Sequence, residues 1–458
     1  MRHFWKQTTK KIHLTTTQII MLTFLCTILI GSLLLMLPAA TASGERCPFV
    51  TALFTSTTSV CVTGLVVVDT FSYWSFFGKL VILILIQIGG LGVITLWAML
   101  MILMRRQLSL GSRLIVRDYF NLDNTRGLMR FMKRVIKAVL FLEGAGAIAY
   151  CFILVPRSGF FKGVWESVFT SVSALCNAGI DIFGPDSLAS FQTNLPINII
   201  TMVLIVSGGL GFVVWFDLID AFKARRKTRT GRIAPRLHEH THLVLWSTII
   251  LLIAGFLMVM IGEFHNPGTI GDLPLPQKML ASMFQSVTFR TAGFSTIPQA
   301  KLTPFTCISG LFYMFIGGSP AGTAGGVKTV TVAIIYLNAA AYIRQKNETV
   351  VFGRRITAQM VAKAIAVVTV SLSMTIIFTL MLVLVSDAPA LSAAYEIFSA
   401  TGTVGLSRGL TSTLNTAGRL IVILAMYAGR IAPISMMLFF TTKDNDSVRY
   451  PTGMFLIG

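Results

Sequence analysis

Long apolar stretches alternate along the chain with short ones, and polar residues gather in the loops between them. The long stretches that precede a short one occupy residues 18–37, 135–155, 243–261 and 360–385, and those that follow one occupy residues 80–104, 197–218, 308–341 and 420–440. About 20 apolar residues are needed to cross a bilayer as a helix, so the pattern predicts eight transmembrane helices.

The short apolar stretches are about half as long as a membrane span requires. They cover residues 49–58, 163–173, 278–287 and 391–400, and each runs into a polar loop. Irregular backbone at membrane depth is tolerated only where protein covers it or where it lines a watery path. We therefore expect these stretches to be re-entrant pore helices.

The four loops that end the short stretches are similar to one another. They read SVCVTGL at 59–65, ALCNAGI at 174–180, FRTAGF at 289–294 and GTVGL at 402–406. Their glycines, Gly64, Gly179, Gly293 and Gly405, are separated by 115, 114 and 112 residues. Repetition at a nearly fixed period indicates four copies of one structural unit, arranged around a common axis.

The predicted fold is an all-α integral membrane protein with four tandem helix–pore-loop–helix repeats around a central pore. The eight transmembrane helices and four re-entrant pore loops fall into repeats at residues 14–104, 105–222, 223–343 and 344–441, between an N-terminal segment at 1–13 and a C-terminal tail at 442–458. The basic start of the chain resembles a signal peptide. Its apolar stretch is too long and lacks a suitable cleavage site, so we expect a retained first helix.

Composition and charge define the orientation. Apolar residues make up 54% of the chain and charged residues 12%, with a net charge of +20. Of the 38 Lys and Arg residues, 27 lie in the termini and in segments 105–137, 223–236 and 344–363. Basic loops stay on the cytoplasmic side, so both termini are expected there and the glycine loops enter from outside. The charge therefore indicates topology and not a nucleic acid partner. Two crossings per repeat also disfavour inverted repeats.

Four backbone loops around one axis can present carbonyl oxygens that replace the hydration shell of a monovalent cation. Glycine suits such a loop because it adopts left-handed backbone angles and lets the chain approach the axis. A single glycine in an apolar chain is usually a packing contact, but four copies at the same place favour an ion filter. Its predicted residues are Val62, Thr63, Gly64, Leu65, Asn177, Ala178, Gly179, Ile180, Thr291, Ala292, Gly293, Phe294, Thr403, Val404, Gly405 and Leu406.

Small residues recur 24 to 29 positions after each filter glycine, at residues 89–92, 208–211, 317–326 and 429–433. Helix packing is the expected reason in the first two repeats. The third run cannot hold a regular helix, and Lys328 beyond it is expected to anchor at the inner membrane interface. Arg430 lies at the equivalent depth in the fourth repeat. It either satisfies nearby backbone carbonyls or acts as an electrostatic gate, and the gate is favoured because a cation near the axis opposes ion passage.

The VTGL, NAG, RTAGF and GTVGL loops resemble those of the superfamily of Trk, Ktr and HKT potassium transporters, from about residue 14 to the end of the chain. The chain is most similar to the membrane subunit of Ktr systems, because no helical hairpin precedes the first repeat and residues 448–453 resemble that subunit's ending. The resemblance implies potassium uptake across the plasma membrane, often sodium-dependent, with potassium held at the filter residues. It also implies a homodimer, in contact with membrane lipid, on a cytosolic nucleotide-binding ring of the RCK type. No cofactor is expected on this chain itself.

The resemblance identifies residues 317–328 as an intramembrane gating loop. The gate residues are Gly317, Gly318, Ser319, Gly322, Thr323, Gly325, Gly326 and Arg430. In plant relatives serine at the first filter glycine accompanies sodium selectivity, so Gly64 favours potassium. The four filter loops differ in side chains, so selectivity weaker than in a symmetric filter is expected. The alternatives are a sodium-permeable or poorly selective transporter of this fold and, from another class, a non-transporting membrane enzyme or structural protein.

Charged residues near the loops have two interpretations. Arg290, Glu166 and Glu396 either form an outer-rim ion pair that braces the loops or are solvated charges at the mouth. Three acidic residues are expected to be solvated, with a negative potential that concentrates cations as the alternative; these are Asp69, Asp181 and Asp387.

Side chains for metal or enzyme chemistry are sparse. His238, His240 and His242 alternate in a basic loop and either bind a transition metal or form a polar connector, which is the favoured interpretation. The six cysteines are dispersed, and Cys61 and Cys176 are expected to pack behind the filter carbonyls. No phosphate-binding glycine–lysine motif is present, so any nucleotide dependence would come from another chain.

Overall fold

The computed structural model describes residues 16–92, 128–184, 186–227 and 237–431. The four long stretches expected at the start of the repeats are confirmed as helices. They are α1 (Thr16–Leu35), α7 (Leu128–Ser158), α11 (Glu239–Glu263) and α15 (Ala358–Val385). Within the described residues these four helices are long and apolar enough to cross a membrane. Large apolar side chains are exposed along each of them, as expected for a surface in contact with lipid.

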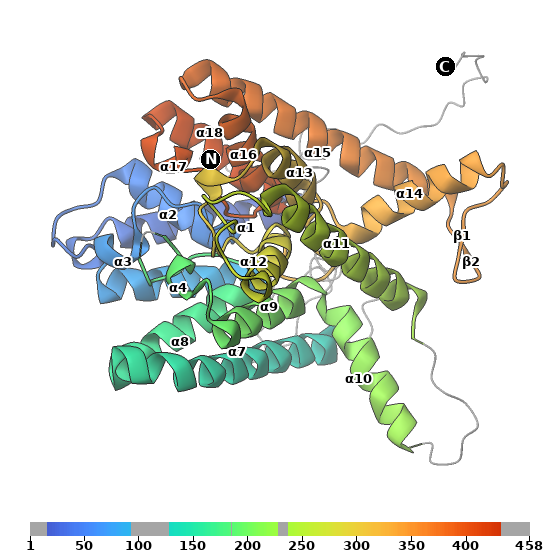
Figure 1. Ribbon diagram of the computed structural model, residues 1–458, viewed down its shortest axis with the longest axis horizontal. Coiled ribbons are helices and arrows are strands. Elements are labelled where there is room, and N and C mark those ends of the chain that lie inside the picture. Colours follow the sequence, from blue (N-terminus) through green and yellow to red (C-terminus); the bar gives the residue numbers. More distant parts are fainter. Residues whose placement is uncertain (1–15, 93–127, 185, 228–236, 432–458) are drawn as a thin grey trace, which may run out of the picture.

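The short apolar stretches also form helices, each packed against the long helix before it, as Figure 1 shows for α7 and α8. They are α2 (Phe49–Cys61), α8 (Phe160–Leu175), α12 (Leu275–Thr288) and α16 (Ala390–Gly402). In the first three pairs a serine of the short helix donates to a carbonyl of the long helix, from Ser56 to Ile28 at 2.7 Å, Ser171 to Glu143 at 2.7 Å and Ser286 to Leu252 at 2.8 Å. The fourth pair instead joins the hydroxyls of Thr375 and Thr401 at 3.1 Å. A buried hydroxyl needs a hydrogen-bond partner, so each of these bonds fixes the position of the short helix along the axis of the long helix.

The second long stretches differ from the expected unbroken spans. In the described residues they are α4 (Phe76–Leu91), α9 (Leu195–Gly209) followed by α10 (Phe212–Lys227), α13 (Pro304–Phe315) followed by α14 (Thr329–Ile343), and α18 (Thr416–Ile431). Helices α9 and α10 meet at 98°. Neither is long enough to cross a membrane alone, but the pair would add a fifth span to the four long helices if the two were counted as one bent helix. Residues 316–328, here called the central loop, are not helical, as the sequence predicted.

The glycines expected to pack helices do so in the first two repeats. Gly89 packs against the Val60 carbonyl and Gly208 against the Leu175 carbonyl, and in the fourth repeat Gly429 packs against the Thr401 carbonyl. Packing is nevertheless not the whole explanation for either run, because α4 ends at Leu91, just before Gly92 (φ +82°), and α9 ends just before the second run is complete. Gly211 has φ +90°, a left-handed conformation that breaks the helix between α9 and α10.

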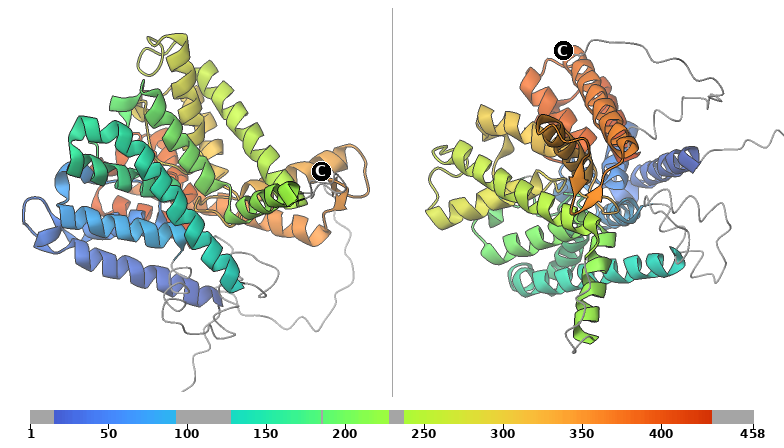
Figure 2. Two further views of the ribbon diagram at one scale, coloured as in Figure 1. Left: turned by 90° about the horizontal axis from the view of Figure 1, so that it is seen from below. Right: turned by 90° about the vertical axis from the view of Figure 1, so that its right-hand side faces the viewer.

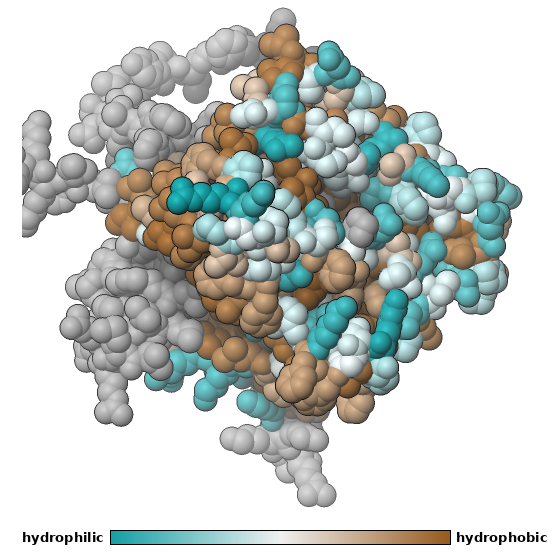
Figure 3. Space-filling view, turned by 90° about the vertical axis from the view of Figure 1, so that its left-hand side faces the viewer, coloured by the Kyte–Doolittle hydropathy of each residue, from teal (hydrophilic) through white to brown (hydrophobic). Residues whose placement is uncertain are grey.

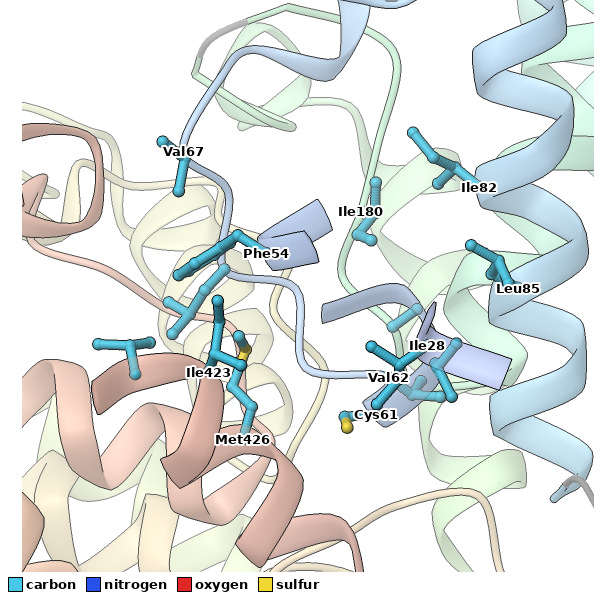
Figure 4. Packing of buried hydrophobic residues seen from close by; sticks show 14 of the residues in the cluster. Ile28, Phe54, Cys61, Val62, Val67, Ile82, Leu85, Ile180, Ile423 and Met426 are labelled. Carbon is cyan, nitrogen blue, oxygen red and sulfur yellow. The ribbon is translucent and has the colours of Figure 1, made fainter. Parts of the chain in front are cut away.

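The first and fourth repeats lie side by side, so the first described helices pack against the last ones. One hydrophobic cluster takes Ile28 from α1, Phe54 from α2, Ile82 from α4 and Met426 from α18 (Figure 4). Tyr427 of α18 also donates to the Met21 carbonyl of α1 at 2.8 Å. Contacts between the two ends of the chain turn four consecutive units into a ring.

The two ends of this ring differ in character. Short elements of the connecting loops occupy one end: η1 (Pro38–Ala40), α3 (Thr70–Tyr73), η2 (Ala189–Phe191), η3 (Gln299–Lys301) and α17 (Leu410–Thr413). Figure 3 looks onto this end and shows hydrophilic side chains interspersed with apolar ones. Figures 1 and 2 place α10, α14 and a two-stranded hairpin, β1 (Val350–Val351) and β2 (Arg354–Arg355), at the opposite end. The hairpin is a small exception to the predicted all-α fold.

The repeat boundaries stay predictions. The boundary at 222/223 falls inside α10, and that at 343/344 coincides with the end of α14. Those at 13/14, 104/105 and 441/442 lie outside the described residues, as do the expected ends of the spans at 80–104 and 420–440.

Candidate functional site

The four glycine loops, residues 62–65, 177–180, 291–294 and 403–406, touch one another in sequence order. A Cβ added to Gly64 would lie 2.6 Å from the Ala178 oxygen, and one added to Gly179 would lie 2.6 Å from the Ala292 oxygen. A Cβ on Gly293 would lie 2.8 Å from the Val404 oxygen. Gly405 faces the Thr63 oxygen in the same way, and this contact closes the circle. Each glycine therefore packs against the carbonyl of the residue that precedes the glycine of the next repeat.

The loops share one backbone conformation. Two residues before each glycine, the chain adopts a left-handed angle at Val62 (φ 56°), Asn177 (φ 59°), Thr291 (φ 63°) and Thr403 (φ 50°). The glycines themselves have φ of 98°, 64°, 82° and 92° in chain order. A β-branched residue rarely adopts positive φ, and here three of the four residues are valine or threonine. Strain repeated at four equivalent places points to a function that depends on the backbone.

Hydroxyl groups at the ends of the short helices hold the loops, and the sequence argument missed them. Thr58 accepts from the Gly64 amide and Ser399 accepts from the Gly405 amide, both at 3.0 Å. Ser173 donates to the Ile180 carbonyl at 2.6 Å, and Thr288 donates to the Phe294 carbonyl at 2.5 Å. The signal was present in the sequence, because a hydroxyl residue stands six positions before the glycine in the first, second and fourth loops and five positions before it in the third loop.

A cavity of about 390 Å³ opens directly above the four glycines. Its lining includes Asp69, Asp181, Gln299 and Thr411 from the loops that follow the glycines. Burial raises the pKa of Asp181 to about 6, opposed by hydrogen bonds from Ser187 and the Phe183 amide and reinforced slightly by Asp69. Asp69 also caps α3, accepting from two amides of that helix at 3.1 Å.

Two of the three acidic residues therefore face the cavity, which favours the cation-concentrating alternative over plain solvation for them. Asp387 is exposed and does not line the cavity.

The central loop lies against the opposite side of the ring. Thr323 hydrogen-bonds Asn177 at 3.1 Å through its hydroxyl, which also donates to the Leu175 carbonyl at 3.0 Å. The amides of Thr323 and Ser319 donate to the last carbonyls of α9, at 3.1 Å for Gly208 and 2.9 Å for Gly209. Those carbonyls have no intrahelical partner, so the central loop caps α9. Lys328, expected at the inner interface, instead donates within the loop to the Ala324 carbonyl at 2.7 Å.

Arg430 bridges the central loop to the first repeat. Its guanidinium donates to the Thr323 carbonyl at 2.7 Å and to the Gly89 carbonyl at the end of α4. Satisfying backbone carbonyls is the structural role considered for this residue. One of the two carbonyls belongs to the predicted gate, and the gate role itself stays a prediction.

The outer-rim ion pair is wrong. Glu166 pairs with Lys162 at 3.8 Å, and Glu396 accepts hydrogen bonds from Ser407 and Thr411. No ion pair of Arg290 occurs in the part of the chain that the structure describes. Arg290 is 8% exposed and borders a small cavity beside Gly209 and Gly318, so it is neither at the rim nor solvated. The sequence could not show this, because a residue next to a filter loop can face either end of the ring.

The histidine run is divided among different partners. His238 lies 3.5 Å from Asp217 of α10, and the ring of His242 packs against Phe352 of the hairpin with 5.4 Å between centroids. In residues 16–92, 128–184, 186–227 and 237–431 no group of three or more side chains is placed to bind a metal. Cys61 and Cys176 are buried behind the loops as predicted.

Comparisons with known proteins all find proteins that are described as cation or potassium transporters. Residues 3–449 match the TrkH family model, described as a cation transport protein. The chain is 36% identical to the Ktr system potassium uptake protein B of Bacillus subtilis, over 98% of each chain. It is 34% identical to the potassium/sodium uptake protein NtpJ of Enterococcus hirae, over 97% of this chain and 98% of that protein. The crystal structure of the potassium transporter TrkH from Vibrio parahaemolyticus shares the fold, with a TM-score of 0.74 at 18% identity over 95% of this chain and 87% of that one.

The glycine contacts of the ring are testable apart from any activity. Alanine at Gly179 or at Gly409 adds roughly 1 kcal/mol of backbone strain, because both have positive φ. At Gly179 the new methyl group would also lie 2.6 Å from the Ala292 oxygen, whereas nothing lies within 4 Å at Gly409. We expect Gly179→Ala to lower the melting temperature in detergent strongly and Gly409→Ala only slightly. Equal losses would contradict the tight ring.

Proposed function

This chain belongs to the TrkH family of cation transport proteins, and we propose that its four glycine loops form the filter of a potassium uptake pathway. The observation that carries the proposal is the closed ring of four loops with one shared left-handed backbone pattern. In such a ring, backbone carbonyls directed at the axis substitute for the water around a monovalent cation. Membership in a family of cation transport proteins favours this proposal over the alternative of a membrane enzyme or a purely structural protein.

Polar atoms near the inner level of the ring support a hydrated path. The Thr291 and Thr403 hydroxyls and the Asn177 amide nitrogen are buried, and no hydrogen-bond partner for them lies in the described residues. Buried polar groups nearly always find a partner, so the two hydroxyl oxygens are suited to meet water or the passing ion, whereas the amide nitrogen can only donate to water. The external cavity with Asp69 and Asp181 supplies negative charge at the entrance.

The choice between potassium and sodium rests on Gly64 and on the relatives. Glycine at this place favours potassium by resemblance, and one relative is named a potassium uptake protein while another is named a potassium/sodium uptake protein. A sodium-permeable or poorly selective transporter of the same fold is the second candidate. The different side chains at Val62, Asn177, Thr291 and Thr403 favour it, because they break the fourfold symmetry of the ring.

The central loop is the proposed gate. It lies beneath Asn177 and is joined to α9 by backbone hydrogen bonds and to α4 through Arg430. Its movement away from the axis would open the path to the cytoplasm. Arg430 holds the loop in the position seen here and adds a positive charge that opposes cation passage.

The surroundings of the transporter follow from the same reasoning. The excess of basic residues supports a cytoplasmic position for the end of the molecule that carries α10, α14 and the β1–β2 hairpin, and for both termini. We assign to this side the docking of a cytosolic RCK-type ring, which would carry the nucleotide, and we expect the chain to form a homodimer. One of the relatives is named as a protein of a Ktr system, which supports the expectation of a partner subunit.

Gly64→Ser tests the filter. A Cβ at Gly64 would lie 2.6 Å from the Ala178 oxygen and 3.2 Å from the Gly405 Cα. It meets fewer very close backbone atoms than a Cβ at Gly179 would, so we expect a folded protein with a locally displaced ring. Potassium preference over sodium should fall roughly fivefold, equivalent to about 1 kcal/mol. The measurement is potassium-dependent growth of a bacterial strain lacking its own uptake systems, with sodium competition of rubidium uptake, with and without a co-expressed ring subunit.

Gly44→Ser is the matched control for this test. Gly44 also has positive φ (74°), but nothing lies within 4 Å of its Cβ position. Its selectivity should stay that of the unmodified chain. Unchanged selectivity in both Gly64→Ser and Gly405→Ser would count heavily against the filter.

Arg430→Ala tests the gate. The substitution removes two hydrogen bonds between the central loop, α4 and α18. Potassium flux into proteoliposomes should rise about three- to tenfold, because closed-state contacts worth one or two hydrogen bonds are lost. A deletion within residues 317–326 should act in the same direction. A well-folded variant with unchanged or lower flux would sink the gate assignment.

External pH tests the cavity charge. The pKa of Asp181 is raised to about 6, so its carboxyl is an anion at pH 7.5 and becomes neutral as the pH falls to 5. Uptake at low potassium should then slow by about two- to fivefold, the effect of one partly screened charge near the path. Asp181→Asn should be slow at both pH values. A variant that keeps the pH dependence of the unmodified chain would show that another group is responsible.

A further inference from the structure

A buried hydrogen-bond network joins the third and fourth repeats beside the ring. Gln299, six residues after Gly293, accepts at its side-chain oxygen from Gln285 of α12 and from Tyr395 of α16, both at 2.9 Å. Its nitrogen donates to the Gln285 oxygen at 3.0 Å and to the Ile297 carbonyl at 2.9 Å. A carbonyl can only accept, so the bond to Ile297 fixes the orientation of the Gln299 amide. Tyr395 is therefore the donor.

The equivalent places in the other repeats lack the tyrosine hydroxyl. Tyr395 stands ten residues before its filter glycine, and the same place holds Phe54 and Phe169 in the first two repeats. In the third it holds Phe284, nine residues before Gly293, because α12 reaches its loop one residue sooner. The hydrogen bonds show this offset. Ala292 binds the carbonyl four residues back, whereas the corresponding amides of the other loops, Thr63, Ala178 and Val404, bind the carbonyl five residues back.

A second position separates the repeats in the same way. The residue after each aromatic is Gln285 in the third repeat and Glu396 in the fourth, and both reach the segment beyond the filter glycine. In the first two repeats it is threonine. Thr55 donates to its own helix at Thr51, 3.0 Å away, and the Thr170 hydroxyl has no partner among the residues described. Long polar side chains therefore brace only half of the ring.

Helix α16 fastens two filter loops at once. Tyr395 holds the segment after the third loop through Gln299, and the adjacent Glu396 holds the segment after the fourth through Ser407 and Thr411. The two loops meet where Gly293 packs against the Val404 carbonyl. A shift of one segment relative to the other must change the carbonyl positions at this contact.

We propose that Tyr395 is a positioning residue that, through Gln299, sets the spacing of the third and fourth filter loops and thereby the preference for potassium over sodium. The inference rests on the proposed function, because it assigns an origin to the selectivity of that filter. Discrimination between two cations of equal charge depends on small differences in carbonyl geometry. Because the brace is confined to the third and fourth loops, we expect the carbonyl positions of these two loops to determine the preference between potassium and sodium.

Tyr395→Phe is the direct test, and the chain supplies evidence that it will fold. Phenylalanine already occupies the equivalent buried place in the other three repeats. The substitution removes one hydroxyl, and the Gln299 oxygen keeps its bond from Gln285. Tyr150→Phe is the matched control, because it also removes a buried hydroxyl, bonded to Thr201 at 2.6 Å, but between α7 and α9.

The measurement is the ratio of potassium to sodium flux into proteoliposomes containing the full chain, with Gly64→Ser as reference. We expect Tyr395→Phe to lower this ratio about three- to tenfold, the equivalent of one buried hydrogen bond, and Tyr150→Phe to leave it unchanged. The melting temperatures in detergent should fall by similar amounts in both, which separates positioning from general destabilisation.

Two outcomes would overturn the inference alone. The first is an unmodified flux ratio in Tyr395→Phe when Gly64→Ser has lost selectivity. The second is an equal loss of selectivity in Tyr395→Phe and Tyr150→Phe. If Gly64→Ser and Gly405→Ser both keep the full flux ratio, the filter assignment fails and the role of Tyr395 fails with it.

Discussion

Contact between a glycine of one loop and a carbonyl of the next is the constraint on which the rest of this structure depends. Non-helical backbone at membrane depth needs cover from protein or water, and four loops cover one another only if all four meet. A side chain at the contact would separate them, which is why Gly64, Gly179, Gly293 and Gly405 occupy it. The short helices, the hydroxyls at their ends and the closure of α1 against α18 all serve to bring the loops to this contact.

Symmetry holds at the ring and fails around it. The four loops share their backbone angles, whereas the third is reached one residue sooner and only the third and fourth carry long polar braces. Likewise, an irregular segment of the length of the central loop interrupts only the third repeat among the described residues. A cation on the axis requires similar loops on all sides, but a gate or a brace needs only one. The ring contacts are therefore shared by all four loops, whereas the proposed gate and brace belong to particular ones.

The central loop shows how a broken helix is stabilised inside a membrane protein. It satisfies the terminal carbonyls of α9, and Arg430 satisfies one carbonyl of the loop and one of α4. These bonds are few and join separate elements, so the loop can exchange them without unfolding a helix. A contact that caps a helix end is also one that can be released, which suits a segment that lies against the glycine loops and is proposed to be a gate.

The sequence by itself determined the first long helix and the short helix of each predicted repeat and the four glycines that meet, because apolar length and a fixed period can be read along the chain without knowing which segments touch. It also marked the break at residues 317–326, where small residues and proline cannot sustain a helix. Only the tertiary structure decided that the helix turns at Gly211, that Arg290 is buried beside Gly318, and that Arg430, Tyr395 and Thr58 bind particular backbone or side-chain groups. These partners either belong to another repeat or come within reach only because a short helix is rotated to face them. The spacing of residues along the chain does not encode the rotation of a helix, because the packing of the four units against one another decides it.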